Sequence, residues 1–205
     1  MDKTQIPDIV VGRLPIYLRA LSRMALEGAR VTSSRELGKK LGISSAQIRK
    51  DLSHFGEFGK QGTGYHIDFL IGKLREILKV DHEWEVALVG VGVLGRALAH
   101  YAGFRDRGFR ISLIFDNDPA KVGTKLNGFE INDSARIGEL IRERGLTLAM
   151  IAVPAEHAQK VADELVKAGV RGILNYAPIN LAVPEGVKVQ YIDPVAHLQR
   201  MTFYV

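Results

Sequence analysis

Apolar positions follow two different patterns along the chain, and the pattern changes near residue 80. In the first part, apolar residues recur every three or four positions, which is the helical period. In the second part, short apolar runs alternate with helical stretches, as strands and helices do in an α/β fold. We therefore expect a small helical domain, residues 1–80, followed by an α/β domain, residues 84–192.

The first helix is predicted to begin at Pro15 and to end before Gly28, because the fixed φ of proline suits the first helical position. Its apolar stripe is formed by Ile16, Leu18, Leu21 and Ala25. We expect this stripe to face the core of the helical domain.

Two short helices follow, each with a capping signal. Ser33 and Glu36 have the spacing of a capping box, and so do Ser44 and Gln47. Gly42 lies between the two boxes and supplies a stop for the first of these helices. Two short helices joined by a glycine-containing turn form a helix-turn-helix, whose second helix enters the major groove of DNA.

The outward face of that second helix carries the candidate DNA contacts. Arginine and lysine read guanine, and glutamine reads adenine. The candidates are Ser45, Gln47, Arg49, Lys50 and Ser53. A helix pair of this kind also occurs as a plain packing unit, so the pattern alone leaves both interpretations open.

Glycines and aromatic residues are interleaved between Phe55 and Tyr65. This pattern predicts a β-hairpin with a tight turn near Lys60, which would be the wing of a winged-helix domain. Its glycines would let the backbone approach a minor groove, and Lys60 would contact a phosphate. A glycine-rich loop without a special role is the alternative. Asp68 is expected to cap the helix that closes this domain.

Basic residues are concentrated in the first domain. Residues 1–80 hold 14 Lys and Arg against 8 Asp and Glu, a net charge of +6. Residues 81–205 hold 14 against 15, a net charge of −1. A basic domain joined to a near-neutral one indicates that the first contacts a polyanion such as double-stranded DNA, although a basic solvated surface would give the same count.

A glycine fingerprint opens the second domain. The predicted strand Trp84–Val89 runs directly into Gly90, and a helix that includes Tyr101 follows. The G-x-G-x-x-G spacing between a strand and a helix predicts dinucleotide binding. In this arrangement Gly90 makes the turn, Gly92 admits a pyrophosphate and Gly95 packs the helix against the strand. The loop residues expected to line the coenzyme are Gly90, Val91, Gly92, Val93, Leu94 and Gly95.

The next predicted strand, Ile111–Phe115, ends at Asp116, which lies 21 positions beyond Gly95. An acidic side chain at this place accepts hydrogen bonds from a ribose diol and repels a 2′-phosphate, which favours NAD(H) over NADP(H). The nearby Lys121 weakens that preference. Asp116 could alternatively cap the turn that follows it.

The remaining pattern completes a doubly wound sheet of the Rossmann type. Helices are predicted at 136–144 and 154–168, and strands at 146–153, 172–176 and 187–192. Ligands bind at the carboxyl ends of the strands in such sheets. The loops at those ends hold Val153, Pro154 and Asn175, which we expect beside the nicotinamide half. The last segment, 193–205, predicts a helix that packs on its own domain or reaches across to a second copy of the chain.

Composition excludes several classes of function. Cysteine is absent, which excludes disulfides, thiolate metal sites and redox chemistry carried by a thiol. No apolar run is long enough to span a membrane. The polar amino terminus leads into no secretory segment, so we expect a cytoplasmic protein that holds no metal.

Several motifs are shared with one known family. They include Ile48–Ser53 in the second short helix, Gly62–Tyr65, the Gly90–Gly95 loop and Gly172–Asn175. Together with the order of the two domains, they resemble the Rex family of redox-sensing transcriptional repressors. The resemblance implies a homodimer that binds operator DNA when NADH is scarce and leaves it when NADH binds. NADH and NAD+ would be its ligands, and it would have no catalytic residues.

The resemblance also implies a switch. In the family, each C-terminal helix is exchanged between subunits. An arginine of the first helix pairs with an aspartate before that exchanged helix, and a tyrosine of the first Rossmann helix competes for it. The matching positions are Arg19, Asp193 and Tyr101. Ligand binding would then trade one pairing for the other. Pro194 stands where relatives often have an aromatic residue against the nicotinamide.

Two other functions remain open. A small NAD-dependent oxidoreductase would need a positioned base, and the histidines of the second domain have no recognisable partner. Only about 110 residues follow the glycine fingerprint, which leaves little room for a substrate domain. The other alternative keeps the DNA-binding domain but senses coenzyme A or another nucleotide, because those Rossmann variants share the glycine loop.

Overall fold

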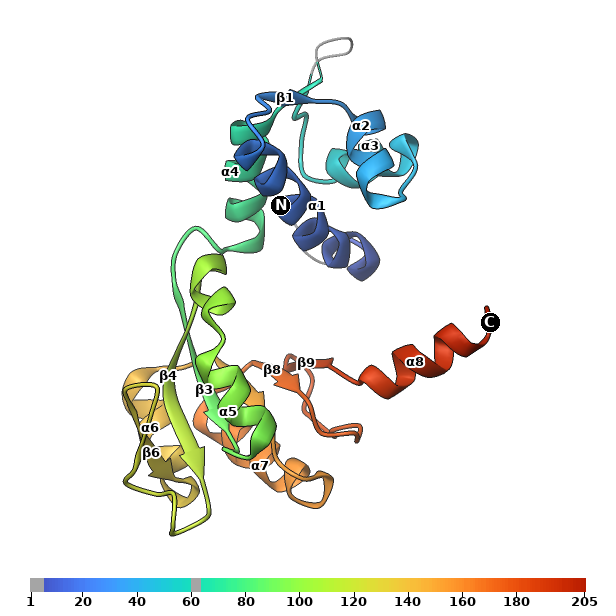
Figure 1. Cartoon of the computed structure of the whole chain (residues 1–205). Coiled ribbons are helices and arrows are strands. Elements are labelled where there is room, and N and C mark those ends of the chain that lie inside the picture. The colour runs from blue at the N-terminus through green and yellow to red at the C-terminus, as the bar shows by residue number, and fades with distance from the viewer. Residues whose placement is uncertain (1–5, 60–63) are drawn as a thin grey trace. The chain divides into compact units, whose positions relative to one another are not determined.

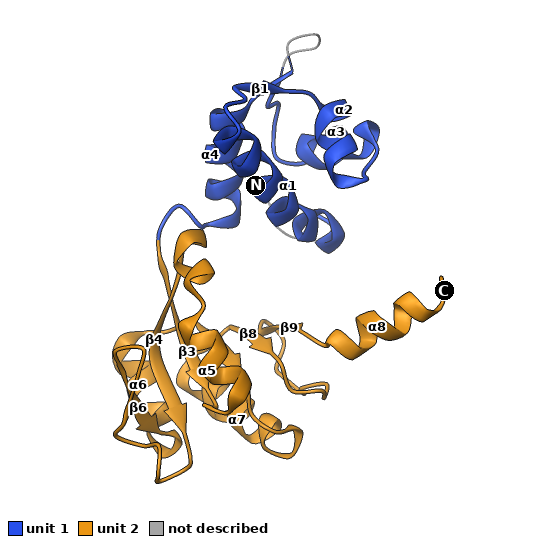
Figure 2. Cartoon of the chain, viewed as in Figure 1, with its two compact units in different colours: residues 1–82 blue, residues 83–205 orange. Residues whose placement is uncertain are grey.

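The computed structural model describes residues 6–59 and 64–205. The chain divides into two compact units, residues 1–82 and residues 83–205 (Figure 2). Lys60 and the turn predicted around it lie outside the described residues.

The described part of unit 1 consists of four helices and a two-stranded sheet (Figure 1). The helices are α1 (Asp8–Leu26), α2 (Ser34–Leu41), α3 (Ser45–Ser53) and α4 (Ile67–Leu78), and the strands are β1 (Val31–Thr32) and β2 (Tyr65–His66). All four helices contribute to one hydrophobic core, and α2 and α3 form the predicted helix-turn-helix.

Helix α1 begins at Asp8, so the predicted start at Pro15 is wrong. Val10 and Leu14 are buried, and this burial continues the helix through the residues before the proline. Pro15 removes one backbone hydrogen bond from the helix interior. The carbonyl that loses its partner belongs to Val11, which is exposed, so water can reach it.

The buried face of α1 also differs from the predicted stripe. The five buried side chains are Val10, Leu14, Tyr17, Leu21 and Met24. Ile16 is 37% exposed, and Leu18 and Ala25 are only partly buried. Of the predicted stripe only Leu21 is fully buried; Ile16 lies one position before the buried Tyr17, and Leu18 and Ala25 lie one position after the buried Tyr17 and Met24.

Each predicted capping box of the helix-turn-helix forms one of its two hydrogen bonds. Ser33 Oγ accepts a hydrogen bond from the Glu36 N–H at 3.1 Å, and Ser44 Oγ accepts one from the Gln47 N–H at 3.1 Å. The return bonds of the boxes go elsewhere. The Glu36 carboxylate accepts from Thr32 Oγ1, and the Gln47 amide donates to Asp51.

The predicted hairpin of the wing has a different strand partner. Strand β2 pairs antiparallel with β1, which precedes the helix-turn-helix, with Val31 opposite His66 and Thr32 opposite Tyr65. The described part of the intervening loop, up to Gly59, contains no strand. The two arms of the loop still approach closely, because a Cβ on Gly59 would lie 2.6 Å from the Gly64 carbonyl oxygen.

Helix α4 closes unit 1, but Asp68 does not cap it. The cap position is His66, which makes no capping hydrogen bond with its side chain. Asp68 lies in the first turn, where an acidic side chain interacts favourably with the helix dipole.

Unit 2 is a seven-stranded sheet with helices on both faces (Figure 1). The spatial order of its strands is β5-β6-β4-β3-β7-β8-β9, and only the β5–β6 pair is antiparallel. The strands are β3 (Trp84–Val89), β4 (Phe109–Asp116), β5 (Lys125–Leu126), β6 (Phe129–Asp133), β7 (Leu148–Ile151), β8 (Gly172–Asn175) and β9 (Lys188–Tyr191). Without β5, this is the 3-2-1-4-5-6 order of a doubly wound sheet, so that prediction is confirmed.

Side chains of the central strands alternate between two cores. Ala87 and Val89 of β3 pack with α6 and α7, whereas Val86 and Leu88 pack on the face that α5 covers. The helices of this unit are α5 (Val93–His100), α6 (Ile137–Arg144), α7 (Ala155–Ala168) and α8 (Pro194–Thr202), with short 3-10 helices at Ala102–Arg107 and Ser134–Arg136. The central strands are therefore buried on both faces, as a parallel sheet requires, whereas β9 at the edge of the sheet is largely exposed.

The β5–β6 hairpin was not predicted from the sequence. Its two-residue turn, Asn127–Gly128, has positive φ angles of 50° and 84°. An Asn-Gly pair with this geometry is the strongest short-range hairpin signal, so the sequence did contain the information.

Within the described residues, no helix combines the length and the apolar character that crossing a membrane would need.

Candidate functional sites

Three loops of unit 2 meet at one edge of the sheet. Val89, Ile151 and Asn175 end neighbouring parallel strands in register. The loops that follow these residues therefore leave the sheet side by side. They carry the glycine fingerprint, Val153 with Pro154, and the segment after Asn175. The structure thus brings together all the predicted crevice loops of the second domain.

The three fingerprint glycines have different neighbours. Gly90 has a φ of +96°, and a Cβ there would lie 2.5 Å from the Ala152 carbonyl oxygen. A Cβ on Gly95 would overlap the Gly90 carbonyl oxygen. Beside Gly92, by contrast, a Cβ would meet nothing within 4 Å. Gly90 and Gly95 are required by the fold, whereas the fold gives no reason for a glycine at 92.

The open space beside Gly92 lies at the N-terminus of α5. Gly92 is the cap residue, and its own N–H and those of the first helical turn have no carbonyl acceptor within the helix. Val93 is 92% exposed and Leu94 is also exposed. Free N–H groups and the positive end of the helix dipole form an anion site, which fits the pyrophosphate of a dinucleotide.

Asp116 ends β4 next to this loop and is almost fully buried. Its Oδ2 accepts a hydrogen bond from the Val91 N–H at 2.7 Å, and its Oδ1 accepts one from the Asp118 N–H at 2.9 Å. Lys121 Nζ lies 3.3 Å from both oxygens. Burial opposes the charge on Asp116, but the Asp118 and Val91 N–H groups and Lys121 hold its pKa below the usual carboxyl value. Asp116 is therefore ionised at neutral pH, and it holds the glycine loop as well as the turn after β4.

The other predicted crevice residues are placed in two ways. Val153 is half-buried against Gly90, and Pro154 is exposed at the cap of α7. Asn175 is fully buried and bonds within its own loop. Its Nδ2 donates to the carbonyls of Ala177 and Ile179, both at 3.0 Å, and its Oδ1 accepts from the Ala177 N–H. Asn175 thus shapes the loop rather than presenting its amide to a ligand.

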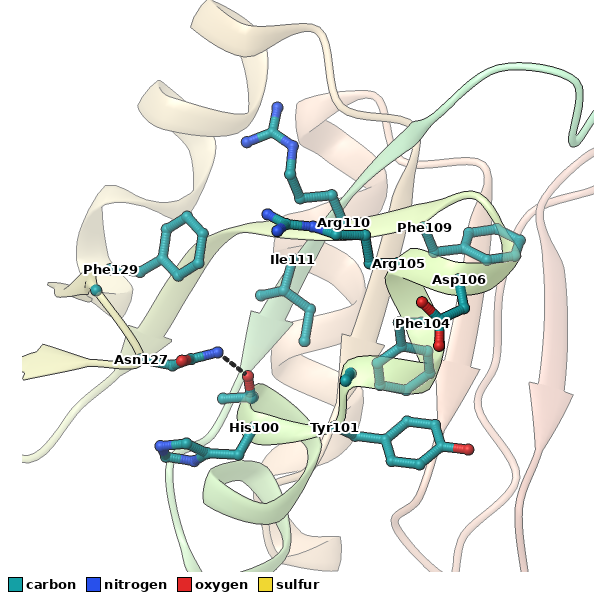
Figure 3. Close-up of a pocket in the computed structure, with 13 residues that line it drawn as sticks. His100, Tyr101, Phe104, Arg105, Asp106, Phe109, Arg110, Ile111, Asn127 and Phe129 are labelled. Carbon is teal, nitrogen blue, oxygen red and sulfur yellow. Dashed lines mark hydrogen bonds between the residues drawn. The ribbon is translucent and has the colours of Figure 1, made fainter.

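A separate cavity of about 470 Å³ lies at the opposite edge of unit 2 (Figure 3). It is lined by the first residues of β4, the Asn127–Gly128 turn and the segment after α5. Tyr101 lines it too, and this residue follows α5 as its C-cap rather than lying on the helix as predicted. The Tyr101 hydroxyl accepts a hydrogen bond from Arg107 Nη1 at 3.2 Å, and its ring packs edge-on against Phe104.

The candidate DNA-binding face of unit 1 lies on α3. Arg49 and Lys50 are exposed, and Arg49 Nη1 donates to Ser34 Oγ of α2 at 3.1 Å. Ser53 Oγ donates to the Lys50 carbonyl at 2.8 Å, and Ser45 lies half-buried in the first turn. Gln47 is half-buried, and its amide nitrogen donates to Asp51.

Asp51 is the centre of a buried network that the sequence did not predict. Its Oδ2 accepts from Arg13 Nε and from the Tyr17 hydroxyl, both at 2.5 Å. Its Oδ1 accepts from Arg13 Nη2 and from Gln47 Nε2, both at 2.7 Å. Asp51 stands between Ile48 and Leu52 on the inward face of α3. A carboxylate at such a position needs buried donors, and that requirement was the signal in the sequence.

The network fixes the ionisation states of its members. Burial of Asp51 opposes its charge, but hydrogen bonds from Arg13, Tyr17 and Gln47 keep its pKa below the usual value. Burial and the neighbouring carboxylate raise the pKa of Tyr17 well above its usual value. At neutral pH the site therefore holds an aspartate, a protonated arginine and a neutral tyrosine.

The three predicted switch residues lie in different surroundings. Arg19 is exposed on α1 of unit 1. Asp193 caps α8, where its Oδ1 accepts from the N–H groups of Val195 and Ala196 at 2.9 and 3.3 Å. Tyr101 belongs to unit 2 and is exposed. The exchange of partners among these three residues stays a prediction.

No group of three or more metal-ligating side chains capable of holding an ion occurs in residues 6–59 and 64–205.

Comparison with known proteins gives matches for both units. Residues 5–53 match a family described as "Putative DNA-binding protein N-terminus", and residues 81–179 match one described as "CoA binding domain". The redox-sensing transcriptional repressor Rex of Chloroflexus aurantiacus is 52% identical over 206 residues, which cover 100% of this chain and 97% of that relative.

Solved structures agree with the sequence comparison. The crystal structure of RSP in complex with β-NAD+ and operator DNA matches with a TM-score of 0.93 and 35% identity, over 98% of this chain and 93% of that chain. The structure of RSP in complex with β-NADH matches with a TM-score of 0.90 and 33% identity, over 98% and 95% of the two chains.

Proposed function

The chain belongs to the Rex family of redox-sensing transcriptional repressors, and on that premise we propose that it represses transcription in response to NADH. It binds operator DNA when NADH is scarce and releases the DNA when NADH enters the glycine-lined crevice. The observation that carries this proposal is the combination, in one chain, of a capped helix-turn-helix and a crevice with open space beside Gly92. The protein is a regulator and not an enzyme, as its relatives are named repressors.

The coenzyme site is assigned to the edge where the three loops meet. The free N–H groups at the start of α5 hold the pyrophosphate, with Gly92 leaving room for its approach. Asp116 keeps the loop in shape through Val91 and places a carboxylate near the ribose, which favours NAD(H) over NADP(H), while the ion pair with Lys121 offsets part of that preference. Val153 and Pro154 flank the nicotinamide half, and Asn175 holds the neighbouring loop. The full set is Gly90, Val91, Gly92, Val93, Leu94, Gly95, Asp116, Val153, Pro154 and Asn175.

The DNA site is assigned to α3 and the loop after it. The N-terminal part of α3 enters the major groove, and Lys60 of the wing contacts a phosphate. The contacting residues are Ser45, Gln47, Arg49, Lys50, Ser53 and Lys60. In functional terms, residues 1–80 form the DNA-binding domain, residues 84–192 the NAD(H)-binding domain, and residues 193–205 the C-terminal helix. The protein acts in the cytoplasm, where operator DNA and NADH are both present.

We assign the active form to a homodimer in which α8 is exchanged. The support is the apolar surface of this segment, because Val195, Leu198, Met201 and Phe203 are all at least half exposed in the single chain. Capping of α8 uses one oxygen of Asp193, which leaves the other for Arg19 in one state and for Tyr101 in the other. A pairing of this kind would connect occupation of the crevice to the arrangement of the DNA-binding domains.

Coenzyme A is a second candidate ligand, since the family description matched by residues 81–179 names it. Calorimetric titration with NADH, NAD+ and coenzyme A separates these candidates, and we expect NADH to bind most tightly. A gel-shift with operator DNA at increasing NADH then tests repression directly. Operator binding that is insensitive to NADH but is released by coenzyme A would contradict the proposal.

A further inference from the structure

The four donor atoms around Asp51 fix the position and orientation of its carboxylate. Each oxygen accepts two hydrogen bonds of 2.5–2.7 Å, and the side chain is fully buried. Arg13 and Tyr17 lie one turn apart on α1, so they hold Asp51 from a second helix. The carboxylate is therefore a fixed point on α3.

A fixed carboxylate also fixes the orientation of the Gln47 amide. A carboxylate can only accept hydrogen bonds, so the –NH₂ group of Gln47 must face Asp51. The carbonyl oxygen Oε1 lies on the other side of the amide carbon and is directed away from Asp51. Gln47 is the third residue of α3, within the part of a recognition helix that contacts base edges.

Resting on the proposed function, we propose that Asp51 is a specificity-determining positioning residue that makes Gln47 present an acceptor to the DNA. The base opposite Gln47 Oε1 must then offer an amino group in the major groove, as adenine N6 and cytosine N4 do. Guanine O6 and thymine O4 are acceptors, and they would face Oε1 without a proton between them.

The predicted preference is tested by binding-site selection on randomised operators, followed by competition with the four base pairs at the selected position. We expect wild type to select adenine or cytosine at one operator position, and Gln47→Ala to lose any base preference at that position. The expected discrimination is roughly fivefold, at the lower end of the cost of one mismatched base pair. A merely structural defect would lower the affinity for all four operators alike.

Two substitutions at position 47 test the acceptor itself on an accessible, partly exposed side chain. Gln47→Glu cannot donate to Asp51, and repulsion between the two carboxylates turns its oxygens outward, so it should keep the preference for an amino-bearing base while binding all DNA more weakly. Gln47→Lys presents only donors and should shift the preference to guanine or thymine. If both variants select the same base, or if Gln47→Glu selects guanine or thymine, the inference is overturned.

Asp51→Asn tests the positioning. An asparagine can donate to the Gln47 carbonyl, which lets the Gln47 amide turn over and relaxes the preference. Tyr17→Phe is the matched control, because it removes a donor from Oδ2, the oxygen that Gln47 does not contact. This control should keep the wild-type preference. Base selection by Asp51→Asn identical to that of wild type would overturn the inference, and the position 47 variants decide it if Asp51→Asn fails to fold.

The outcomes also separate this inference from the function on which it rests. A wild-type protein that selects no sequence would count against repression of an operator. A selected operator that is indifferent to Gln47 at every position would overturn only the role of Gln47 and Asp51.

Discussion

The two proposed sites of this protein use different groups of the chain: backbone groups in unit 2 and side chains in unit 1. The loop cluster of unit 2 that we assign to NADH consists of backbone: glycines that allow close approach, free N–H groups, and strand ends held in register. The proposed DNA-binding face of unit 1 consists of side chains, and a buried ionic network that joins α1 to α3 holds one of them, Gln47. A backbone site depends on whether a Cβ fits, whereas a side-chain site depends on which partners hold each group. The two sites should therefore respond to substitution in different ways.

The largest expected effect is that of Gly95→Ala in unit 2. A Cβ at this position would overlap the Gly90 carbonyl, so the loop or α5 must shift. We expect a loss of about 3 kcal/mol or more in the free energy of unfolding. Gly92→Ala is the control in the same loop, with open space at its Cβ and an expected cost below about 1 kcal/mol. Urea denaturation of both variants measures the difference, and equal costs would break the contrast between fold-required and ligand-required glycines.

The next largest effect is expected in unit 1 from Arg13→Ala. Removing this guanidinium leaves Asp51 buried with only Tyr17 and Gln47 as donors, at a cost of about 2 kcal/mol. Arg23→Ala on the same helix breaks only the exposed pair with Glu27 and should cost almost nothing. Urea denaturation of the full chain compares the two variants, with the unfolding of unit 1 followed through the amide or fluorescence signals of its own residues.

The same substitution changes the dependence of stability on pH. The pKa of Asp51 is lower in the native protein than in the unfolded chain, where it is about 3.9. The ionised Asp51 therefore adds to the free energy of unfolding above that pH, and this stabilisation is lost as the pH falls through the native pKa. Arg13→Ala raises that native pKa, and the acid loss of stability should begin at a higher pH. If the stability of Arg13→Ala depended on pH between pH 6 and pH 3 as that of wild type does, Arg13 would not hold the charge on Asp51.

A smaller free-energy change with a clear functional result is expected from Gly92→Ala. Its Cβ would occupy the space through which a pyrophosphate approaches the backbone, and NADH affinity should fall more than tenfold. Operator binding without NADH should remain as in wild type. Operator affinity measured at several NADH concentrations tests this, and an undiminished NADH response would move the coenzyme away from this loop.

The smallest effect is expected from Lys50→Ala on the exposed face of α3. Loss of one phosphate contact should weaken operator binding several-fold and reduce the salt slope by about 0.9. Lys73→Ala removes the same charge from α4 and is the control. If the two variants had equal salt slopes, Lys50 would not contact the DNA backbone.

Local signals in the sequence predicted much of this fold. Ser33, Ser44 and Gly42 were identified as caps because each acts on residues within four positions of itself. The crevice was predictable for the same reason, since its glycines follow a strand at a fixed spacing. The role of Asp116 in holding the Val91 N–H and that of Asn175 in shaping its own loop were absent from that prediction.

Errors arose where the partner is distant in sequence. Strand β2 was paired with the neighbouring loop, but its partner, β1, lies before the helix-turn-helix. The two donors that Asp51 has on α1 lie 34 and 38 residues away, and no spacing rule connects them. The start of α1 was misplaced because a local preference of proline was weighed without the burial of Val10. Tertiary contacts decided each of these features.

The pairing of β1 with β2 has a consequence for the nascent chain during its synthesis on the ribosome. Val31 and Thr32 are synthesised about 33 residues before their partners. At about 5–20 residues per second, β1 waits roughly 2–7 s as an open strand edge. An exposed edge invites pairing with another nascent chain, and the usual defence is a very short strand. A length of two residues meets that need, since it offers a neighbour almost no ladder to extend.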